Sequence, residues 1–223
     1  MPHKNVVVDG IKIPSVTTIL NVLDKPGLVY WYGKHGTAEC NRIKEESATF
    51  GTHVHSLIES FLSCQEGMVL LPQDVKYTPE ELACSQSFRE WYKTSGLTPV
   101  SMEPEDAVIS KEYNYQGTWD FIGRKDGTML VADWKTSNAL YDTVGLQLAA
   151  YAQLYGESQG LTGNAIWKLI PHGMAVRIDK KTAKVQVKWY KDLIWYFDVF
   201  KSLLLPYQFV SHTGAWSHEK DEK

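Results

Sequence analysis

The sequence contains no long apolar run. Across its 223 residues, no stretch approaches the ~18 consecutive apolar residues that a membrane-spanning helix requires. Residues 1–5 (Met-Pro-His-Lys-Asn) do not open the apolar segment of a secretory signal. We therefore expect no membrane partner and a cytoplasmic location, in a bacterial or phage-infected cell.

Cysteine is scarce, and its spacing does not match that of a metal site. The three cysteines, Cys40, Cys64 and Cys84, lie far apart and form no Cys-x-x-Cys pair. This pattern argues against a zinc ribbon, an iron–sulfur cluster and a disulfide framework. It favours a reducing compartment.

Neither sign of charge dominates the composition. The chain has 23 Lys and Arg against 26 Asp and Glu, which gives a formal net charge of −3. A strongly basic chain would indicate nucleic-acid binding by charge alone, and this composition does not. Aromatic residues are plentiful by contrast, with 8 Trp and 12 Tyr. They serve either as large core residues or, beside a groove, as platforms on which bases stack.

The length and the hydrophobic pattern predict one domain over residues 1–223. We expect a hairpin and helical cover over 1–50, a core over 51–205 and a polar tail over 206–223. Alternating helix-like and strand-like segments predict an α/β fold with a central mixed β-sheet flanked by helices. The expected helices are 16–23, from 30 towards 46, from 51 onwards, 80–95, 143–155 and 191–205. The expected strands are 100–110, 164–170, 175–178, 184–189 and the two arms of a hairpin within 117–137.

The segment Gly117–Ser137 has the pattern of a β-hairpin. Two strand-like runs flank Asp126-Gly127, a dipeptide that suits a two-residue type I′ turn because both residues tolerate positive φ. Such a turn pairs Lys125 with Thr128. All further pairs then follow from this register.

In that register Asp120 lies directly opposite Asp133, on the same face of the sheet. Like charges placed opposite each other are destabilising, and the usual reason for such a pair is a divalent cation held by oxygen ligands. Strand alternation places Lys135 on the same face. The alternative is an ordinary exposed hairpin. The run Met129–Trp134 argues against it, because that run is apolar on both faces up to Asp133 and so predicts a buried central strand.

Two helical motifs accompany the hairpin. Gly51 precedes an amphipathic segment in which His55 lies at the edge of the apolar stripe. Gln147 and Tyr151 stand at i and i+4 on one face of a later helix. Taken alone, the histidine is most simply a boundary residue and the pair is part of an amphipathic helix.

Two further features are weaker. Glu103 and Glu105 stand near the start of the strand expected over 100–110, where a carboxylate is usually solvated. Tyr30, Trp31 and Tyr32 cluster in the N-terminal helical cover. They either stack on a nucleic-acid strand or pack the helix on the core, and the sequence does not separate these alternatives.

Together these motifs resemble those of a known family. Asp120, followed thirteen positions later by Asp133-x-Lys135, resembles the PD-(D/E)xK nuclease signature. Gly51-x-x-x-His55 and Gln147-x-x-x-Tyr151 resemble the corresponding motifs of its RecB-like exonuclease branch. Glu105, fifteen positions before Asp120, fits the glutamate that this branch carries on the preceding strand, and Glu103 is the fallback.

The resemblance covers most of the chain, from about residue 14 to 155. The segments 14–20 and 25–28 and Trp31 are also similar to phage-type exonucleases and to the mitochondrial genome maintenance exonuclease. Two departures are visible. Trp119 stands where the signature has proline, and the cysteines of cluster-bearing relatives are absent. We therefore expect no iron–sulfur cluster.

The resemblance implies a restriction-endonuclease-like core and a metal site. His55, Asp120, Asp133 and the Trp134 carbonyl would bind Mg²⁺ or Mn²⁺, and an imidazole among oxygen ligands somewhat favours Mn²⁺. Lys135 would orient or deprotonate the attacking water. Glu105 would support the site or bind a second metal.

The resemblance also implies nucleic-acid contacts and partners. The expected DNA-binding residues are Trp31, Thr136, Ser137, Gln147 and Tyr151. The expected activity is a metal-dependent DNA exonuclease acting on single-stranded DNA or on ends. A recombination or replication protein is a possible partner.

Three alternatives stay open. One is a structure-specific endonuclease of the same superfamily, and the sequence does not separate it from an exonuclease. Another is a catalytically silent DNA-binding accessory subunit, which is less favoured because all candidate catalytic residues are present. A metal-dependent hydrolase of another substrate is disfavoured because no His-Glu-x-x-His spacing occurs.

Overall fold

The computed structural model describes residues 7–8, 11–23, 25–64, 75–104 and 106–213. Its helices are α1 (Val16–Leu20), α2 (Pro26–His35), α3 (Thr37–Ser63), α4 (Pro79–Ser95), α5 (Thr143–Ser158), α6 (Asn164–Leu169), α7 (Leu193–Ser202) and α8 (Leu204–Thr213). Its strands are β1 (Val7–Val8), β2 (Ile11–Lys12), β3 (Thr98–Met102), β4 (Val108–Ser110), β5 (Tyr115–Gly117), β6 (Phe121–Lys125), β7 (Thr128–Lys135), β8 (His172–Ile178) and β9 (Val185–Lys191).

A mixed five-stranded sheet forms the centre of the fold, in the order β3-β6-β7-β8-β9. The β7–β8 pair is parallel and the other pairs are antiparallel. Two small antiparallel pairs, β1–β2 and β4–β5, lie outside it. The predicted α/β class with a mixed sheet is confirmed.

The predicted hairpin register is confirmed. Lys125 pairs with Thr128, and pairing continues to Phe121 opposite Ala132. Asp126 and Gly127 form the turn with φ of 51° and 80°, the positive values that an Asp-Gly pair accommodates. Regular pairing ends one residue before Asp120 and Asp133. The two acids therefore stand at the open end of the hairpin.

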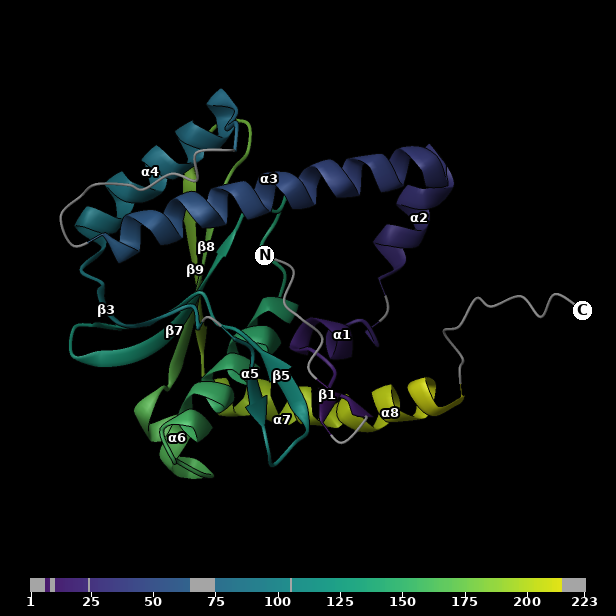
Figure 1. Ribbon diagram of the computed structural model, residues 1–223, viewed down its shortest axis with the longest axis vertical. Coiled ribbons are helices and arrows are strands. Elements are labelled where there is room, and N and C mark those ends of the chain that lie inside the picture. The colour runs from purple at the N-terminus through teal and green to yellow at the C-terminus, as the bar shows by residue number, and fades with distance from the viewer. Residues whose placement is uncertain (1–6, 9–10, 24, 65–74, 105, 214–223) are drawn as a thin grey trace, which may run out of the picture.

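Helices cover both faces of the sheet (Figure 1). On one face α3 and α4 bury Val54, Ile58 and Phe88 against β7 and β8. On the other face, α5 and α7 pack over a larger core that includes Leu148 and Phe197. Residues 129–134 of β7 are accordingly buried on both faces, as expected for a central strand.

The helix expected to begin at Gly51 begins much earlier. Gly51 lies inside α3, a single helix of 27 residues. Gly36, with φ of 77°, separates α3 from α2. A Cβ at position 51 would lie 3.3 Å from Thr136 Oγ1. Glycine thus lets α3 approach the end of β7, a packing role rather than a helix boundary.

Three other predictions of elements were wrong. Residues 164–169 form helix α6 rather than a strand, because a short apolar run does not distinguish the two. The strand expected over 100–110 is divided between β3 and β4, which belong to different sheets. The helix expected over 191–205 is two helices, and α8 continues through residues expected in the polar tail, to Thr213. In the part of the chain that the structure describes, no helix is long and apolar enough to cross a membrane.

The turn between β8 and β9 is held by Asp179, and this gives a prediction about acid stability. Hydrogen bonds from the Thr182 amide (2.9 Å) and from Arg177 (2.6 Å) lower the pKa of Asp179 to about 2, against an ordinary value of 3.8. A lowered carboxyl pKa stabilises the fold at neutral pH, and that stability is lost as pH falls through the folded value. We expect Asp179→Asn to lower the melting temperature at pH 7 and to have a much smaller effect near pH 2.

Thermal melts of both proteins across this pH range test the prediction. Asp198→Asn is a matched control, because Asp198 is an exposed acid in an i,i+3 pair with Lys201. Such pairs contribute little to stability. A melting difference for Asp179→Asn that stays constant from pH 7 to pH 2 would contradict the assignment.

Candidate active site

A cavity of about 420 Å³ opens where the ends of β6 and β7 meet α1, α3 and α5. It is lined by side chains from elements that are far apart in the sequence. Most of the candidate site residues lie on its wall, namely His55, Glu103, Asp120, Asp133, Lys135, Gln147 and Tyr151. The structure therefore gathers the carboxylates, the histidine, the lysine and the Gln–Tyr pair in one place.

Asp133 and Lys135 project from the same face of β7. Asp133 is only 2% exposed, and its Oδ2 lies 2.5 Å from Lys135 Nζ. The same oxygen accepts no aligned hydrogen bond from a described residue. A buried carboxylate needs compensation, and here it comes from one ammonium group, which leaves coordination capacity on the carboxylate unused.

Asp120, His55 and the backbone of Trp134 form the second part of the site. The Trp134 amide donates to Asp120 Oδ2 (2.7 Å). His55 Nε2 lies 2.8 Å from the Trp134 carbonyl oxygen, which requires the proton on Nε2. The other ring nitrogen, Nδ1, then faces Asp120 Oδ2 at 3.8 Å. Helix α3 thus brings an imidazole to the open end of the β6–β7 hairpin.

Burial raises the pKa of one carboxyl group of the site, that of Asp120. Desolvation, with a smaller contribution from nearby Asp133, raises the pKa of Asp120 to about 6, although His55 acts in the opposite direction. A carboxyl with a raised pKa carries an unfavourable charge at neutral pH. A cation bound beside Asp120 would relieve that cost.

Gln147 and Tyr151 form a polar pair on α5. Gln147 Nε2 donates to the Tyr151 hydroxyl (2.9 Å), and both side chains line the cavity. Burial and nearby Asp133 raise the pKa of Tyr151, so the hydroxyl stays protonated. Gly117 makes room for the ring, since a Cβ there would lie 2.8 Å from Tyr151 Cε1.

The donor set fits a hard divalent cation. Two carboxylates, a backbone carbonyl and an imidazole are ligands that Mg²⁺ and Mn²⁺ accept, and Asp133 Oδ2 has unused acceptor capacity. Among the described residues, however, no three His, Cys, Asp or Glu side chains already form a metal cluster. Asp133 is turned to Lys135, while His55 and Asp120 are held by the Trp134 backbone.

Three other predicted residues, Trp31, Thr136 and Ser137, are not among the residues that line the cavity. Thr136 is buried beside Gly51, and Ser137 follows it. Trp31 contacts Tyr32 and His35 on α2, at ring-centre distances of 5.4 and 6.0 Å. Glu105 lies outside the described residues, and Glu103 lines the cavity.

One wall of the cavity includes Ser15, Thr17 and Gln116, which were not predicted from the sequence. Gln116 Nε2 donates to the Ile13 carbonyl oxygen (2.6 Å), and its backbone amide donates to that of Pro14 (2.9 Å). The run 14–20 was interpreted as part of the family resemblance and of an expected helix, and not as a wall of the site. The packing of this segment against β5 depends on contacts between residues about 100 positions apart in the sequence.

A further carboxylate near the site, Glu59, was also missed. It lies one helical turn after His55, and burial together with nearby Glu103 raises its pKa. The i,i+4 spacing from His55 is the signal that indicates it. His53, two positions before His55, is directed elsewhere, since its Nδ1 lies 2.9 Å from Glu81 Oε1.

One comparison with known proteins covers most of the chain. The family model described as "PD-(D/E)XK nuclease superfamily" matches residues 27–193. A search of curated proteins found no match. A solved structure titled "Crystal structure of SSO0001" is similar at 12% identity, over 92% of this chain and 78% of that one, with a TM-score of 0.38.

Proposed function

The chain belongs to the PD-(D/E)XK nuclease superfamily, and from this we propose that it is a metal-dependent exonuclease that hydrolyses phosphodiester bonds of DNA. One observation carries the proposal. Asp120, Asp133 and Lys135 meet in a single cavity with His55 and the Gln147–Tyr151 pair. The motifs that resemble the RecB-like branch are thus neighbours in space. We infer single-stranded DNA or DNA ends as the substrate.

His55, Asp120, Asp133 and the Trp134 carbonyl would hold Mg²⁺ or Mn²⁺. When bound, such an ion would stabilise the negative charge that develops on the phosphate and lower the pKa of a water ligand. The raised pKa of Asp120 and the unused acceptor capacity of Asp133 Oδ2 support this assignment.

Lys135 would act on the attacking water and on the phosphate. Its Nζ is fixed at the cavity wall by Asp133. A positioned ammonium orients the oxygen that attacks and offsets charge that develops on the phosphate oxygens. Gln147 and Tyr151 would contact the nucleic-acid backbone from the opposite side with neutral donors, as would the hydroxyls of Ser15 and Thr17.

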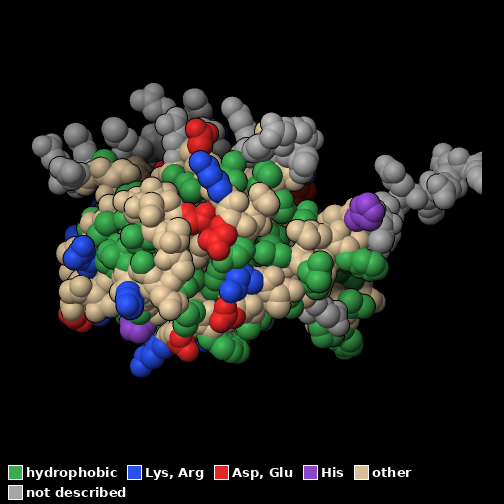
Figure 2. Space-filling model, turned by 90° about the horizontal axis from the view of Figure 1, so that it is seen from below, with side chains coloured by type: hydrophobic (Ala, Val, Ile, Leu, Met, Phe, Trp, Pro, Cys, Tyr) green, Lys and Arg blue, Asp and Glu red, His purple; other side chains and the backbone are tan. Residues whose placement is uncertain are grey.

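The surface charge is consistent with recognition inside the cavity. Figure 2 shows the face on the side of α6, α7 and α8, where acidic and basic side chains are interspersed and no large basic patch forms. The formal net charge of −3 agrees. The face shown therefore offers DNA no broad basic surface, and the proposed binding rests on the cavity and its bound cation.

Metal removal and end labelling test the proposal directly. Single-stranded DNA labelled at either end is incubated with the protein in Mg²⁺, Mn²⁺ or EDTA. We expect progressive shortening with either metal and none in EDTA, and the order of label loss gives the polarity. Cleavage of circular DNA at the same rate would instead establish an endonuclease. Binding without cleavage of any substrate would establish an accessory subunit.

A further inference from the structure

A buried arginine lies beside the catalytic lysine, on the neighbouring strand. Arg177 of β8 is directly paired with Lys135 of β7 in the parallel register. Residues paired in this way direct their side chains to the same face. Arg177 is 8% exposed and does not line the cavity. Its charge is therefore adjacent to the site without being part of its wall.

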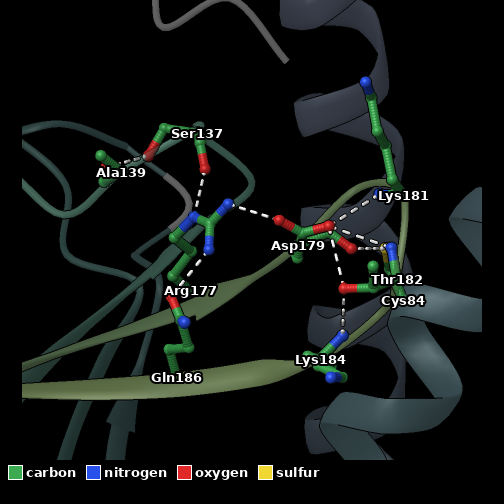
Figure 3. Close-up of polar contacts among 9 residues, drawn as sticks. All are labelled: Cys84, Ser137, Ala139, Arg177, Asp179, Lys181, Thr182, Lys184 and Gln186. Carbon is green, nitrogen blue, oxygen red and sulfur yellow. Dashed lines mark hydrogen bonds and ion pairs between the residues drawn. The ribbon is translucent and has the colours of Figure 1, made fainter.

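The Arg177 guanidinium joins three segments of chain (Figure 3). Its Nε donates to the Ser137 carbonyl oxygen (2.5 Å). Its two terminal nitrogens donate to Gln186 Oε1 (2.7 Å) on β9 and to Asp179 Oδ2 (2.6 Å). One rigid planar group thus fixes the backbone just after β7 against β8 and β9.

Asp179 is itself held by hydrogen bonds, so Arg177 donates to an acceptor whose position is fixed. It accepts hydrogen bonds from the amides of Lys181 (3.1 Å) and Thr182 (2.9 Å). Its own carbonyl oxygen accepts from the Cys84 thiol of α4 (3.7 Å). Adjacent Lys180 lies over the Phe50 ring of α3, 5.4 Å from the ring centre. The turn between β8 and β9 is therefore joined to both α3 and α4.

The segment that Arg177 holds follows the catalytic strand immediately. Ser137 is two residues after Lys135, and β7 ends at Lys135. Beyond Lys135 the chain is no longer paired with β8 in the sheet. The Ser137 hydroxyl donates to the Ala139 carbonyl oxygen (2.8 Å), a local contact that does not anchor the segment to the sheet. The Arg177–Ser137 bond supplies such an anchor.

We propose that Arg177 is a positioning residue, which fixes Thr136 and Ser137 and thereby the end of β7 that carries Lys135. The inference rests on the proposed nuclease function for its catalytic consequence. Arginine suits this task because a planar fork of donors reaches three acceptors at once, whereas the donors of a lysine ammonium share one nitrogen at the end of a flexible stem. Lysine at position 177 would keep the charge and lose the geometry.

Hydrogen exchange tests the positioning without relying on activity. In Arg177→Lys we expect faster amide exchange in residues 136–140 and unchanged exchange in residues 129–133. Arg124→Lys, the same change at an exposed arginine of β6, is the matched control and should leave both segments unchanged. If Arg177→Lys fails to fold, Gln186→Ala should raise exchange in the same segment, because it frees one arm of the guanidinium. Unchanged exchange at 136–140 in the folded variants would overturn the proposal.

Kinetics separate positioning from a general structural role. We expect Arg177→Lys to lower the single-turnover cleavage rate about tenfold or more while Mn²⁺ affinity changes by less than about twofold. A parallel loss of metal affinity, or a rate equal to that of the unmodified protein, would contradict the proposal. If the unmodified protein cleaves no substrate, the proposed function fails, and the exchange experiment still decides whether Arg177 fixes the segment.

Discussion

Replacing Lys135 with methionine should lower the single-turnover rate of DNA cleavage about 10²- to 10⁴-fold, the range of one lost proton-transfer or charge-stabilising group. Methionine keeps the length of the side chain and removes the ammonium that lies 2.5 Å from Asp133. Rapid-quench measurements at saturating enzyme, with Mn²⁺ present, report this step. Because the metal ligands remain, the binding of Mn²⁺ should persist.

Two companion variants sharpen the test of Lys135. Lys188→Met removes a partly exposed lysine of the same sheet, one that pairs with Asp142, and should cleave at the normal rate. Asp133→Asn should abolish cleavage and also weaken Mn²⁺ binding in calorimetry, since it removes a proposed ligand. If Lys135→Met is folded and cleaves as fast as the unmodified protein, Lys135 has no catalytic role.

The second large effect concerns the packing that supports the site. Phe88 of α4 is fully buried and its ring centre lies 4.8 Å from that of Trp134, the residue whose backbone binds His55 and Asp120. Phe88→Ala should lower the free energy of unfolding by about 3–5 kcal/mol, the usual cost of a large cavity. This is a substantial part of the roughly 5–15 kcal/mol by which domains are stable. Urea denaturation measures it.

A control on the same helix distinguishes burial from helix propensity. Leu82 is 46% exposed, and Leu82→Ala should change the unfolding free energy by less than about 1 kcal/mol, because little apolar surface leaves the core. Equal destabilisation by the two variants would mean that α4 does not pack on the sheet in the way described.

The local pattern of the sequence determined the register of the hairpin. A two-residue Asp126-Gly127 turn permits one register, and that register brings Asp120 and Asp133 to the open end of the hairpin, where both line the cavity. The buried run before Asp133 likewise identified the central strand. These predictions held because turn geometry and strand alternation act within about ten residues of chain.

Helix boundaries and short apolar runs were less well determined. Gly51 was interpreted as a boundary, yet it lies within α3, where it packs close to Thr136 instead of ending a helix. The run 164–169 is apolar enough for a strand, yet it forms α6, in which Ile166 packs against Gly156 of α5. Local propensity is a weak constraint when tertiary contacts compete with it.

The sequence by itself determined which chemical groups are present and how the hairpin orders two acids and a lysine. Only the tertiary structure decided what surrounds them. Three hydrogen bonds join distant segments at or beside the site. They link His55 to the Trp134 carbonyl, Gln116 to the Ile13 carbonyl, and Arg177 to the Ser137 carbonyl. Such contacts depend on how helices and strands pack in three dimensions, and no periodicity in the sequence encodes the distance between two side chains that meet only after folding.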